Sequence, residues 1–242
     1  MKRYGLIGQS LGHSFSPSFF KKYFEEQQIE AVYELIELDS LENCREAIKE
    51  FDGCNVTIPY KESIIPFLDE LSDDAKAIGA VNVIQVVNGK LIGHNTDAFG
   101  FHQSIKPFLT NLHERGLILG TGGASKAVAH VLKSIGLDVF YISRSPNNEN
   151  EFPYDQVNEQ MLASCKLIVN TTPVGMHPNN DALIPLPYAF LTPEHLSVDL
   201  IYNPRKTRFL QESELRGAAI LNGETMLKEQ ALKAYRIWNK DV

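Results

Sequence analysis

The chain has 242 residues, of which 43% are hydrophobic and 22% are charged, and its formal net charge is -7 at pH 7. This length is sufficient for one large or two modest domains, and the composition is that of an ordinary globular protein. The negative charge argues against nucleic acid or an anionic membrane as the main partner, because both attract basic surfaces.

The amino-terminal sequence and the cysteines indicate a cytoplasmic protein. The basic pair Lys2 and Arg3 is followed by an apolar run too short for a signal peptide, and no stretch approaches the length of a membrane-spanning helix. The three cysteines contain no C-x-x-C pair, and the histidines lack ligand-like spacing. We therefore expect a reduced setting, no disulfide framework and no metal ion, with the oligomeric state open between a monomer and a homodimer.

The first segments are predicted to be a strand at 3–7, a loop at 8–16 and a helix from Pro17 to about Gln27. Ser16 is predicted to cap this helix. Capping does not explain Ser14. Two hydroxyls ahead of a helix N-terminus form a good receiver for a carboxylate, so capping alone and anion binding both stay open at this point.

Polar side chains accompany the third predicted strand. We predict a strand at 31–38, a helix at 41–51 and a strand at 53–58. Alternation along the last of these puts Asn55 and Thr57 on one face and Cys54, Val56 and Ile58 on the other. With Lys61 close behind, functional groups lie at the carboxyl end of a strand, where ligands bind in open α/β sheets. The simpler interpretations are a surface lysine and polar groups that bond to nearby backbone.

A hairpin is predicted next, after a short helix at 72–78. Apolar runs at 80–87 and 90–93 flank Asn88-Gly89, which is the strongest short hairpin signal and predicts a mixed sheet with an antiparallel edge. Asn82 interrupts the first run and needs a partner if it is buried. Asp97 follows the second run and precedes a helix at 98–109, where its simplest role is to stabilise the helix N-terminus.

Residues 117–132 are typical of a nucleotide-phosphate site. A short buried strand is followed by Gly120, Gly122 and Gly123 and then by an alanine-rich helix from Ala124. A pyrophosphate must approach backbone N–H groups at a helix N-terminus, and a Cβ at these turn positions would block it. Ser125 replaces the third glycine of the usual motif, so an ordinary glycine turn remains an alternative for this segment alone.

The next predicted strand, at 138–143, carries the residues that distinguish the cofactor. Where an NAD enzyme usually has an acidic residue, this chain has Arg144 between Ser143 and Ser145. A guanidinium with flanking hydroxyls suits a 2′-phosphate, which a carboxylate would repel. The sequence therefore predicts NADP, with an ordinary solvated arginine as the alternative.

The remainder of the chain alternates strand and helix. Residues 145–156 are predicted to be a loop, followed by a helix through Met161 and strands at 166–170, 197–201 and 218–221. This alternation predicts a parallel doubly wound sheet. An amphipathic helix follows from 222, with Met226 and Gln230 on one face, and Gln230 is most simply a solvated residue.

Taken together, the motifs resemble the shikimate dehydrogenase family over nearly the whole chain. They are HSFSP at 13–17, NVTIPYK at 55–61, GAVNVI at 79–84, NTDAFG at 95–100, LGTGGASKA at 119–127, NTTPVGM at 170–176, VDLIYNPRKT at 198–207 and NGETMLKEQA at 222–231. The resemblance implies an α/β enzyme that reduces 3-dehydroshikimate to shikimate with NADPH, in aromatic amino acid biosynthesis. It implies a substrate-binding domain at 1–100, completed by 223–242, and a Rossmann-like NADP-binding domain at 101–222.

The resemblance also implies roles for particular residues. Lys61 and Asp97 would form the catalytic pair. The substrate carboxylate and ring hydroxyls would be bound by Ser14, Ser16, Thr57, Asn82, Asp97, Tyr202 and Gln230. The cofactor would be bound by Gly120, Gly122, Gly123, Ala124, Ser143, Arg144, Thr171 and Gly223.

The chain departs from the family pattern after Arg144 and after Trp238. Pro146, Asn147 and Asn148 stand where the family often has a further basic residue, which would weaken the preference for NADP, and the family's last helix is expected to be missing after Trp238. Two alternatives are a quinate/shikimate dehydrogenase that uses NAD and a nucleotide-sensing regulator without chemistry. Arg144 argues against the first, and retention of the catalytic pair argues against the second.

Overall fold

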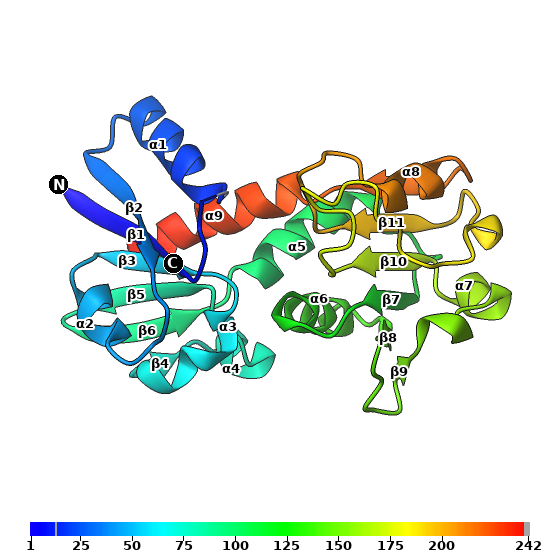
Figure 1. Cartoon of the computed structure of the whole chain (residues 1–242), viewed down its shortest axis with the longest axis horizontal. Helices are drawn as coiled ribbons and strands as arrows, with labels where there is room; N and C mark the ends of the chain where they lie inside the picture. Colours follow the sequence, from blue (N-terminus) through cyan, green and yellow to red (C-terminus); the bar gives the residue numbers. More distant parts are fainter. Residues whose placement is uncertain (13, 240–242) are drawn as a thin grey trace. The chain divides into compact units, whose positions relative to one another are not determined.

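The computed structural model describes residues 1–12 and 14–239, so His13 of the HSFSP motif and residues 240–242 lie outside the described residues. The chain divides into two compact units (Figure 1). The first unit comprises Met1–Thr96 with Gln230–Val242, and the second comprises Asp97–Glu229. Each unit is built on its own sheet, as the predicted α/β fold class requires.

The sheet of the first unit is mixed, in the order β2-β1-β3-β5-β6-β4. Its strands are β1 (Lys2–Gly8), β2 (Ala31–Glu37), β3 (Gly53–Val56), β4 (Glu70–Leu71), β5 (Val83–Val87) and β6 (Lys90–His94). Only β5 runs antiparallel to its neighbours, and β4 pairs parallel to β6 at the edge. The mixed sheet is confirmed, but the predicted antiparallel edge is wrong because β4 pairs parallel to β6 outside the hairpin.

The β5–β6 hairpin forms where the sequence predicts it. Asn88 and Gly89 have φ of 52° and 76°, the left-handed conformation that a tight turn between twisted strands requires. The preceding helix, α4 (Asp73–Ile78), is capped by Ser72, whose side chain accepts the Ala75 N–H, and it ends at Gly79 with φ of 71°.

Two predictions near β1 and β3 are wrong in detail. The helix α1 (Ser16–Glu26) begins at Ser16 itself, and its N-cap is Phe15, without a capping side-chain hydrogen bond among the described residues. Ser16 is therefore not the cap. Strand β3 ends at Val56, and Ile58 is 78% exposed instead of facing the core. The chain turns away from the sheet at Thr57, and a cis peptide precedes Pro59.

Helices cover both faces of the first sheet. One face packs against α1 and the last part of α9 (Glu224–Trp238), with Tyr4, Phe20 and Trp238 in the shared core. Trp238 lies so close to Gly53 that an added Cβ would be 2.1 Å from its ring, and its indole N–H donates to Ile84 O at 3.1 Å. The other face packs against α2 (Cys44–Lys49), α3 (Tyr60–Ser63) and α4.

The sheet of the second unit is parallel throughout, in the order β12-β11-β10-β7-β8-β9. Its strands are β7 (Arg115–Leu119), β8 (Asp138–Ile142), β9 (Glu151–Phe152), β10 (Leu167–Asn170), β11 (Leu196–Asp199) and β12 (Ala219–Leu221). The predicted doubly wound sheet is confirmed. The segment predicted as a loop at 145–156 contains β9, which is too short to show a hydrophobic period.

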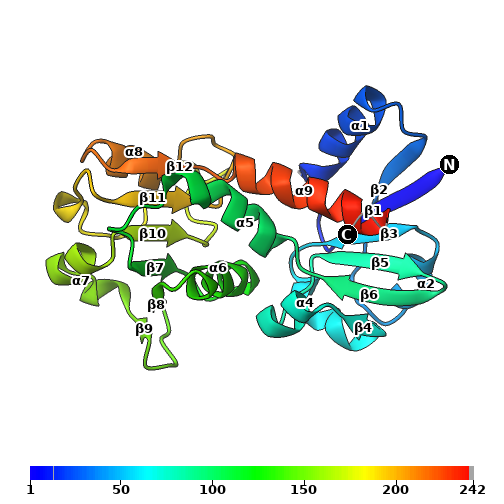
Figure 2. The same cartoon turned by 180° about the vertical axis from the view of Figure 1, so that it is seen from behind.

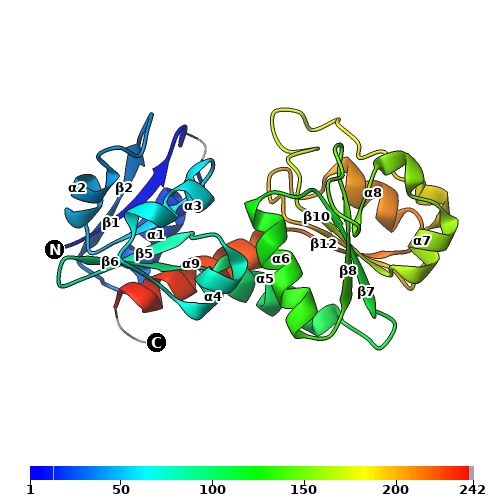
Figure 3. The same cartoon turned by 90° about the horizontal axis from the view of Figure 1, so that it is seen from below.

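Helices lie on both faces of this second sheet (Figure 3). Helices α5 (Asp97–Ile105) and α6 (Gly123–Ser134) pack together on one face, and α7 (Glu159–Ser164) and α8 (Arg208–Glu214) cover the other. Short 3₁₀ turns are η1 (Ile65–Phe67), η2 (Lys106–Phe108), η3 (Tyr154–Gln156) and η4 (Tyr188–Phe190). Within residues 1–12 and 14–239, no helix is both long enough and apolar enough to cross a membrane.

The order in which the chain adds strands to the second sheet reverses between β7 and β10. From β7 the chain builds outward through β8 and β9, then returns to the other side of β7 with β10. Loops at the carboxyl ends of β7 and β10 therefore diverge at a topological switch point, where open α/β sheets bind their ligands. The glycine turn at 120–123 and the loop that starts at Thr171 lie on the two sides of this point.

Candidate active site

Three buried polar side chains form a cluster in the first unit, which we call the amide cluster: Asn82, Thr96 and Gln230. Their exposed fractions are 3%, 1% and 8%. Asn82 donates through Nδ2 to Thr96 Oγ1 at 3.0 Å and to Gln230 Oε1 at 3.4 Å, and its Oδ1 accepts the Thr96 N–H at 2.7 Å. Asn82 thus has the partners its burial requires, whereas the simple interpretation of Gln230 as solvated is wrong.

A second polar chain leads into the amide cluster from α1 and β2. Tyr33 donates its hydroxyl hydrogen to Asn55 Oδ1 at 2.7 Å, and Asn55 Nδ2 donates to Asn82 O at 3.2 Å. Burial raises the pKa of Tyr33 well above its ordinary value, and a hydrogen bond with the Ser16 side chain opposes this. Ser16 is therefore joined to Asn55 through Tyr33, a residue that the sequence pattern did not single out.

The other predicted site residues of this unit, Ser14, Thr57 and Lys61, are half-buried. Ser14 donates its backbone N–H to Leu11 O at 2.9 Å, and Thr57 donates to Ile7 O at 2.9 Å. Lys61 is half-buried in α3, and its carbonyl accepts the Val81 N–H at 2.7 Å. This bond ties α3 to the residue immediately before Asn82.

Asp97 and Tyr202 belong to the second unit. Asp97 is the first residue of α5, directly after Thr96, and is 6% exposed. Tyr202 follows β11 and is half-buried, and burial raises the pKa of its phenol. Thr96 was overlooked in the sequence although it directly precedes Asp97, because its part in the amide cluster depends on how β6 and α9 pack.

The glycine turn after β7 has the geometry of a phosphate cradle. Gly120 has φ of 105°, and a Cβ there would lie 2.9 Å from Thr171 Oγ1. A Cβ on Gly122 would enter open space, with no heavy atom of the described residues within 4 Å. Helix α6 begins at Gly123 without a capping side chain among the described residues, so its first-turn N–H groups suit an anionic ligand.

Ser125 explains why the third glycine of the motif is dispensable here. Its side chain is 1% exposed, and its hydroxyl donates to Gly122 O at 2.5 Å. The hydroxyl is therefore satisfied inside the turn and does not project into the open space beside Gly122. The departure from the usual fingerprint leaves the cradle intact.

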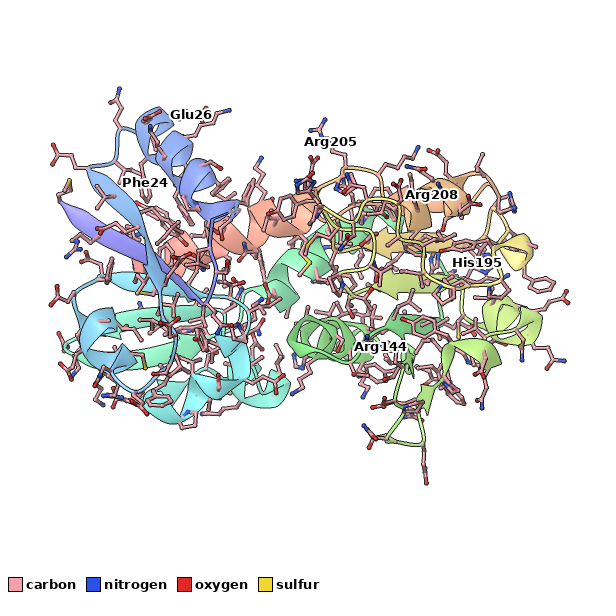
Figure 4. All side chains as sticks on the ribbon, viewed as in Figure 1. Phe24, Glu26, Arg144, His195, Arg205 and Arg208 are labelled. Atoms are coloured by element: carbon pink, nitrogen blue, oxygen red, sulfur yellow. The ribbon has the colours of Figure 1, made fainter. Side chains whose placement is uncertain are left out.

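The carboxyl end of β8 presents Arg144 to solvent (Figure 4). Its charge lowers the pKa of the Tyr154 phenol, against the larger raising effect of burial, so the two side chains are close. Ser143 is 9% exposed and accepts the Ser145 N–H at 3.2 Å. Beyond them, Asn148 Nδ2 donates to Glu151 Oε1 at 2.7 Å and the Asn147 N–H donates to Glu151 Oε2 at 2.9 Å. The acidic residue Glu151 therefore fixes this loop by hydrogen bonds, at the place where the family often has a further basic residue.

Thr171 follows the carboxyl end of β10, and Gly223 follows the carboxyl end of β12. Thr171 donates its N–H and its hydroxyl to Leu119 O at 3.0 and 2.7 Å. Gly223 is buried, and an added Cβ would lie 2.1 Å from Leu200 O. Thr171 therefore lies close to the switch point, and Gly223 lies against the loop that follows β11. Among the described residues no group of three His, Cys, Asp or Glu could hold a metal ion.

A parallel sheet with a switch point, an uncapped glycine turn at that point and an arginine after the next strand define an α/β dinucleotide-binding enzyme. These residues fit NADP, because the space beside Gly122 is open and Arg144 is exposed at the end of β8.

Comparison with known proteins identifies the family. The shikimate dehydrogenase substrate binding domain matches residues 6–84. The shikimate dehydrogenase (NADP(+)) of Carboxydothermus hydrogenoformans is 37% identical, with 97% of this chain and 90% of that protein covered. The corresponding protein of Staphylococcus haemolyticus is also 37% identical, with 98% and 92% covered. The chain belongs to the shikimate dehydrogenase family, as the motifs predict.

Solved structures agree with this assignment. The shikimate dehydrogenase of Aquifex aeolicus superposes with a TM-score of 0.88 at 35% identity, covering 99% of this chain and 93% of the other. The Thermus thermophilus enzyme in complex with NADP(H) and shikimate superposes with a TM-score of 0.87 at 35% identity, covering 99% and 94%. The two-domain α/β fold is therefore confirmed over nearly the whole chain.

Proposed function

We propose that this chain is an NADP-dependent shikimate dehydrogenase, which interconverts 3-dehydroshikimate and shikimate in aromatic amino acid biosynthesis. The observation that carries this proposal is similarity at 37% identity across 97% of the chain to a shikimate dehydrogenase (NADP(+)). Lys61 and Asp97 are both present in the motifs of this chain. In this proposal most substrate-binding residues belong to the first unit, and the cofactor-binding residues belong to the second.

The cofactor is proposed to bind at the carboxyl ends of β7, β8, β10 and β12. Gly120, Gly122, Gly123 and Ala124 would hold the pyrophosphate through backbone N–H groups. Ser143 and Arg144 would hold the 2′-phosphate, and Thr171 and Gly223 would line the remainder of the site. NADPH, when bound, supplies the hydride.

The substrate is proposed to be held by hydroxyl and amide side chains. Ser14 and Ser16 would bind its carboxylate, with Tyr202. Thr57, Asn82, Asp97 and Gln230 would bind the ring hydroxyls. The amide cluster supports this, because Asn82 and Gln230 are buried and already oriented by hydrogen bonds to each other and to Thr96.

Lys61 is proposed to donate the proton. Reduction of the ring ketone leaves an alkoxide, and the ammonium of Lys61 would protonate it, with the carboxylate of Asp97 stabilising the ammonium. In the direction of oxidation Lys61, as the neutral amine, would accept the proton from the hydroxyl. No metal is needed for this step, since the protein itself supplies the charge.

The direct test combines each oxidised cofactor with shikimate or quinate. Purified protein is mixed with shikimate and NADP, shikimate and NAD, and quinate with either, and the absorbance of reduced nicotinamide is followed. Fast reduction of NADP by shikimate is expected. Faster reduction of NAD with quinate would identify the alternative enzyme, and no reduction in any mixture would leave only a nucleotide-sensing protein. We also propose a cytoplasmic monomer or homodimer, which sedimentation of the purified chain distinguishes.

A further inference from the structure

We propose that Asp199 is a positioning residue that holds the cofactor-binding loops after β10 and β11 in place. The residue is at the carboxyl end of β11 and is 0% exposed. It is not among the residues proposed to contact the substrate or the cofactor. The inference rests on the proposed function, because it assigns Asp199 to loops that carry Thr171, Tyr202 and the contact to Gly223.

Three uncharged donors converge on the Asp199 carboxylate. Oδ1 accepts from Asn170 Nδ2 at 3.0 Å and from the Ile201 N–H at 3.0 Å, and Oδ2 accepts from Thr207 Oγ1 at 2.5 Å. Asn170 and Thr207 are 0% and 1% exposed. The donors come from the end of β10, from the loop after β11 and from the residue that caps α8. One side chain therefore links three segments.

The hydrogen bonds continue from Asp199 into the loop after β10. Asn170 turns its Oδ1 to residue 172, where it accepts both the Thr172 N–H at 2.9 Å and the Thr172 hydroxyl at 2.7 Å. The Val174 N–H in turn donates to Thr172 Oγ1 at 3.3 Å. The orientation of Asn170, and with it the loop that starts at Thr171, is thus set by Asp199.

The same series of hydrogen bonds extends to the carboxyl ends of the other strands of the sheet. Thr171 donates to Leu119 O, directly before the glycine turn, and the Gly223 N–H donates to Ile201 O at 3.0 Å. Strands β7, β10, β11 and β12 are consecutive neighbours (Figure 2), so the bonds cross the edge where the cofactor is proposed to bind. Asp199 lies in the middle of this line and is the only member that accepts from three segments among the described residues.

Merely stabilising the fold would not require this arrangement. A buried carboxylate is costly, and an apolar residue of similar size would pack the end of a strand at less cost. What an apolar residue cannot do is accept three donors and orient Asn170 toward Thr172. The chemistry thus points to positioning of the loops. The affinity for the cofactor would report whether the loops are held in place.

The test uses the full chain with Asp199→Ala, Asp199→Asn and Thr172→Val. Asp199→Ala leaves three buried donors without an acceptor, and we expect the Kd for NADPH, measured by nicotinamide fluorescence, and the KM for NADP to rise about 10-fold to 100-fold. Asp199→Asn can keep Asn170 and Ile201 on its carbonyl oxygen and donate its amide hydrogen to Thr207. It should stay within about threefold of the parent protein.

Thr172→Val separates an effect on cofactor binding from an effect on folding. Thr172 is half-buried, and the change removes one hydroxyl between Asn170 and Val174, so the variant tests the line even if Asp199→Ala does not fold. We expect its Kd for NADPH to rise several-fold. Ser213→Ala is the matched control: Ser213 is 0% exposed in the same unit and donates to Phe209 O at 2.9 Å, away from the strand ends. It should bind NADPH as the parent does.

The outcomes separate the two proposals. If the parent protein does not oxidise shikimate with NADP, the proposed function fails before any variant is tested. If the parent is active, the inference is overturned by a folded Asp199→Ala or Thr172→Val variant with unchanged NADPH binding, or by a Ser213→Ala variant that loses binding equally. Weak binding by Asp199→Ala with near-normal binding by Asp199→Asn supports it.

Discussion

The two units build their candidate sites in opposite ways. In the first unit, side chains bond to side chains: Asn82 joins Thr96 and Gln230, and Tyr33 joins Asn55. In the second unit, the groups proposed to face the ligand are mainly backbone N–H groups. Gly120 and Gly122 leave these groups accessible, and buried side chains hold the loops that carry them. The contrast follows from the ligands proposed. Ring hydroxyls need donors and acceptors at fixed points, whereas a pyrophosphate needs many N–H groups at close approach.

The comparison implies that the first unit depends on individual side chains and the second on the positions of its loops. Substitutions in the first unit should therefore change turnover with little effect on cofactor affinity. Substitutions of the buried residues that support the loops of the second unit should change cofactor affinity or stability more than turnover. The predictions below test this division.

The largest effect is expected at Lys61. Lys61→Ala should lower turnover by roughly 10²-fold or more, as removal of a general acid does, with little change in the affinity for NADP. Steady-state kinetics together with NADPH fluorescence titration measure both quantities. Lys76→Ala is the matched control, because Lys76 is an exposed lysine of the same unit on α4. Near-normal turnover of Lys61→Ala would remove the residue from the mechanism.

A large effect on stability is expected from the titration of Asp199. Burial raises its pKa from 3.8 to about 6, against hydrogen bonds from Thr207, Ile201 and Asn170 that lower it. The folded protein thus holds this proton more tightly than the unfolded chain. The stabilisation is present in full below pH 3.8 and is lost as the pH rises through about 6.

This loss of stability can be isolated with Asp199→Asn, in which position 199 carries no titrating group. The free energy of unfolding of the parent, minus that of the variant, should fall by about 3 kcal/mol between acid and neutral pH. Urea unfolding at a series of pH values measures it. Tyr188 is a titratable neighbour on η4, and burial raises its pKa far above this window. All other side chains are the same in the two proteins, so their contributions cancel in the difference. A constant difference across the series would contradict the prediction.

At Arg144 the expected effect is selective for one cofactor. Arg144→Ala should weaken NADP binding by about 1.5 to 3 kcal/mol, the range for hydrogen bonds to charged groups, and should leave NAD nearly unaffected. Titration with each reduced cofactor gives the two free energies. Arg115→Ala is a suitable control, since Arg115 is a half-exposed arginine at the opposite end of β7. Equal losses for NADP and NAD would show that Arg144 does not recognise the 2′-phosphate.

Much of the fold was predictable because local signals agree with the tertiary structure. The glycine turn at 120–123 and the Asn88-Gly89 hairpin require left-handed backbone that few other residues adopt, so the sequence marks them directly. Strands β4 and β9 were missed because two residues show no period, and they exist only by pairing with β6 and β8. The pairing of β4 with β6 makes β6, the second strand of the predicted hairpin, an interior strand.

The candidate site was predictable only in part, for a related reason. Asn82 and Lys61 stand out because polar residues interrupt or follow apolar strands. The burial of Gln230 depends on packing of α9 against the first sheet, and helical spacing alone does not distinguish this from a solvated face. Asp199 sits in the apolar run SVDLI and was included only as part of a strand and of the motif at 198–207, without a role of its own. Its importance depends on hydrogen bonds from Asn170 and Thr207, which lie 29 and 8 residues away in the chain.

The smallest effect is expected at Ser125, where the chain departs from the usual glycine motif. Ser125→Gly removes the hydrogen bond to Gly122 O and places a glycine in the first turn of α6, so the free energy of unfolding should fall by about 1 kcal/mol. NADPH affinity should stay nearly constant, because the Ser125 side chain is buried beneath the turn and the ligand-facing groups are backbone N–H. Urea unfolding and fluorescence titration of the same preparation measure both. A large loss of affinity would mean that the hydroxyl, and not only the backbone, shapes the cradle, and the contrast between the two units would weaken at this point.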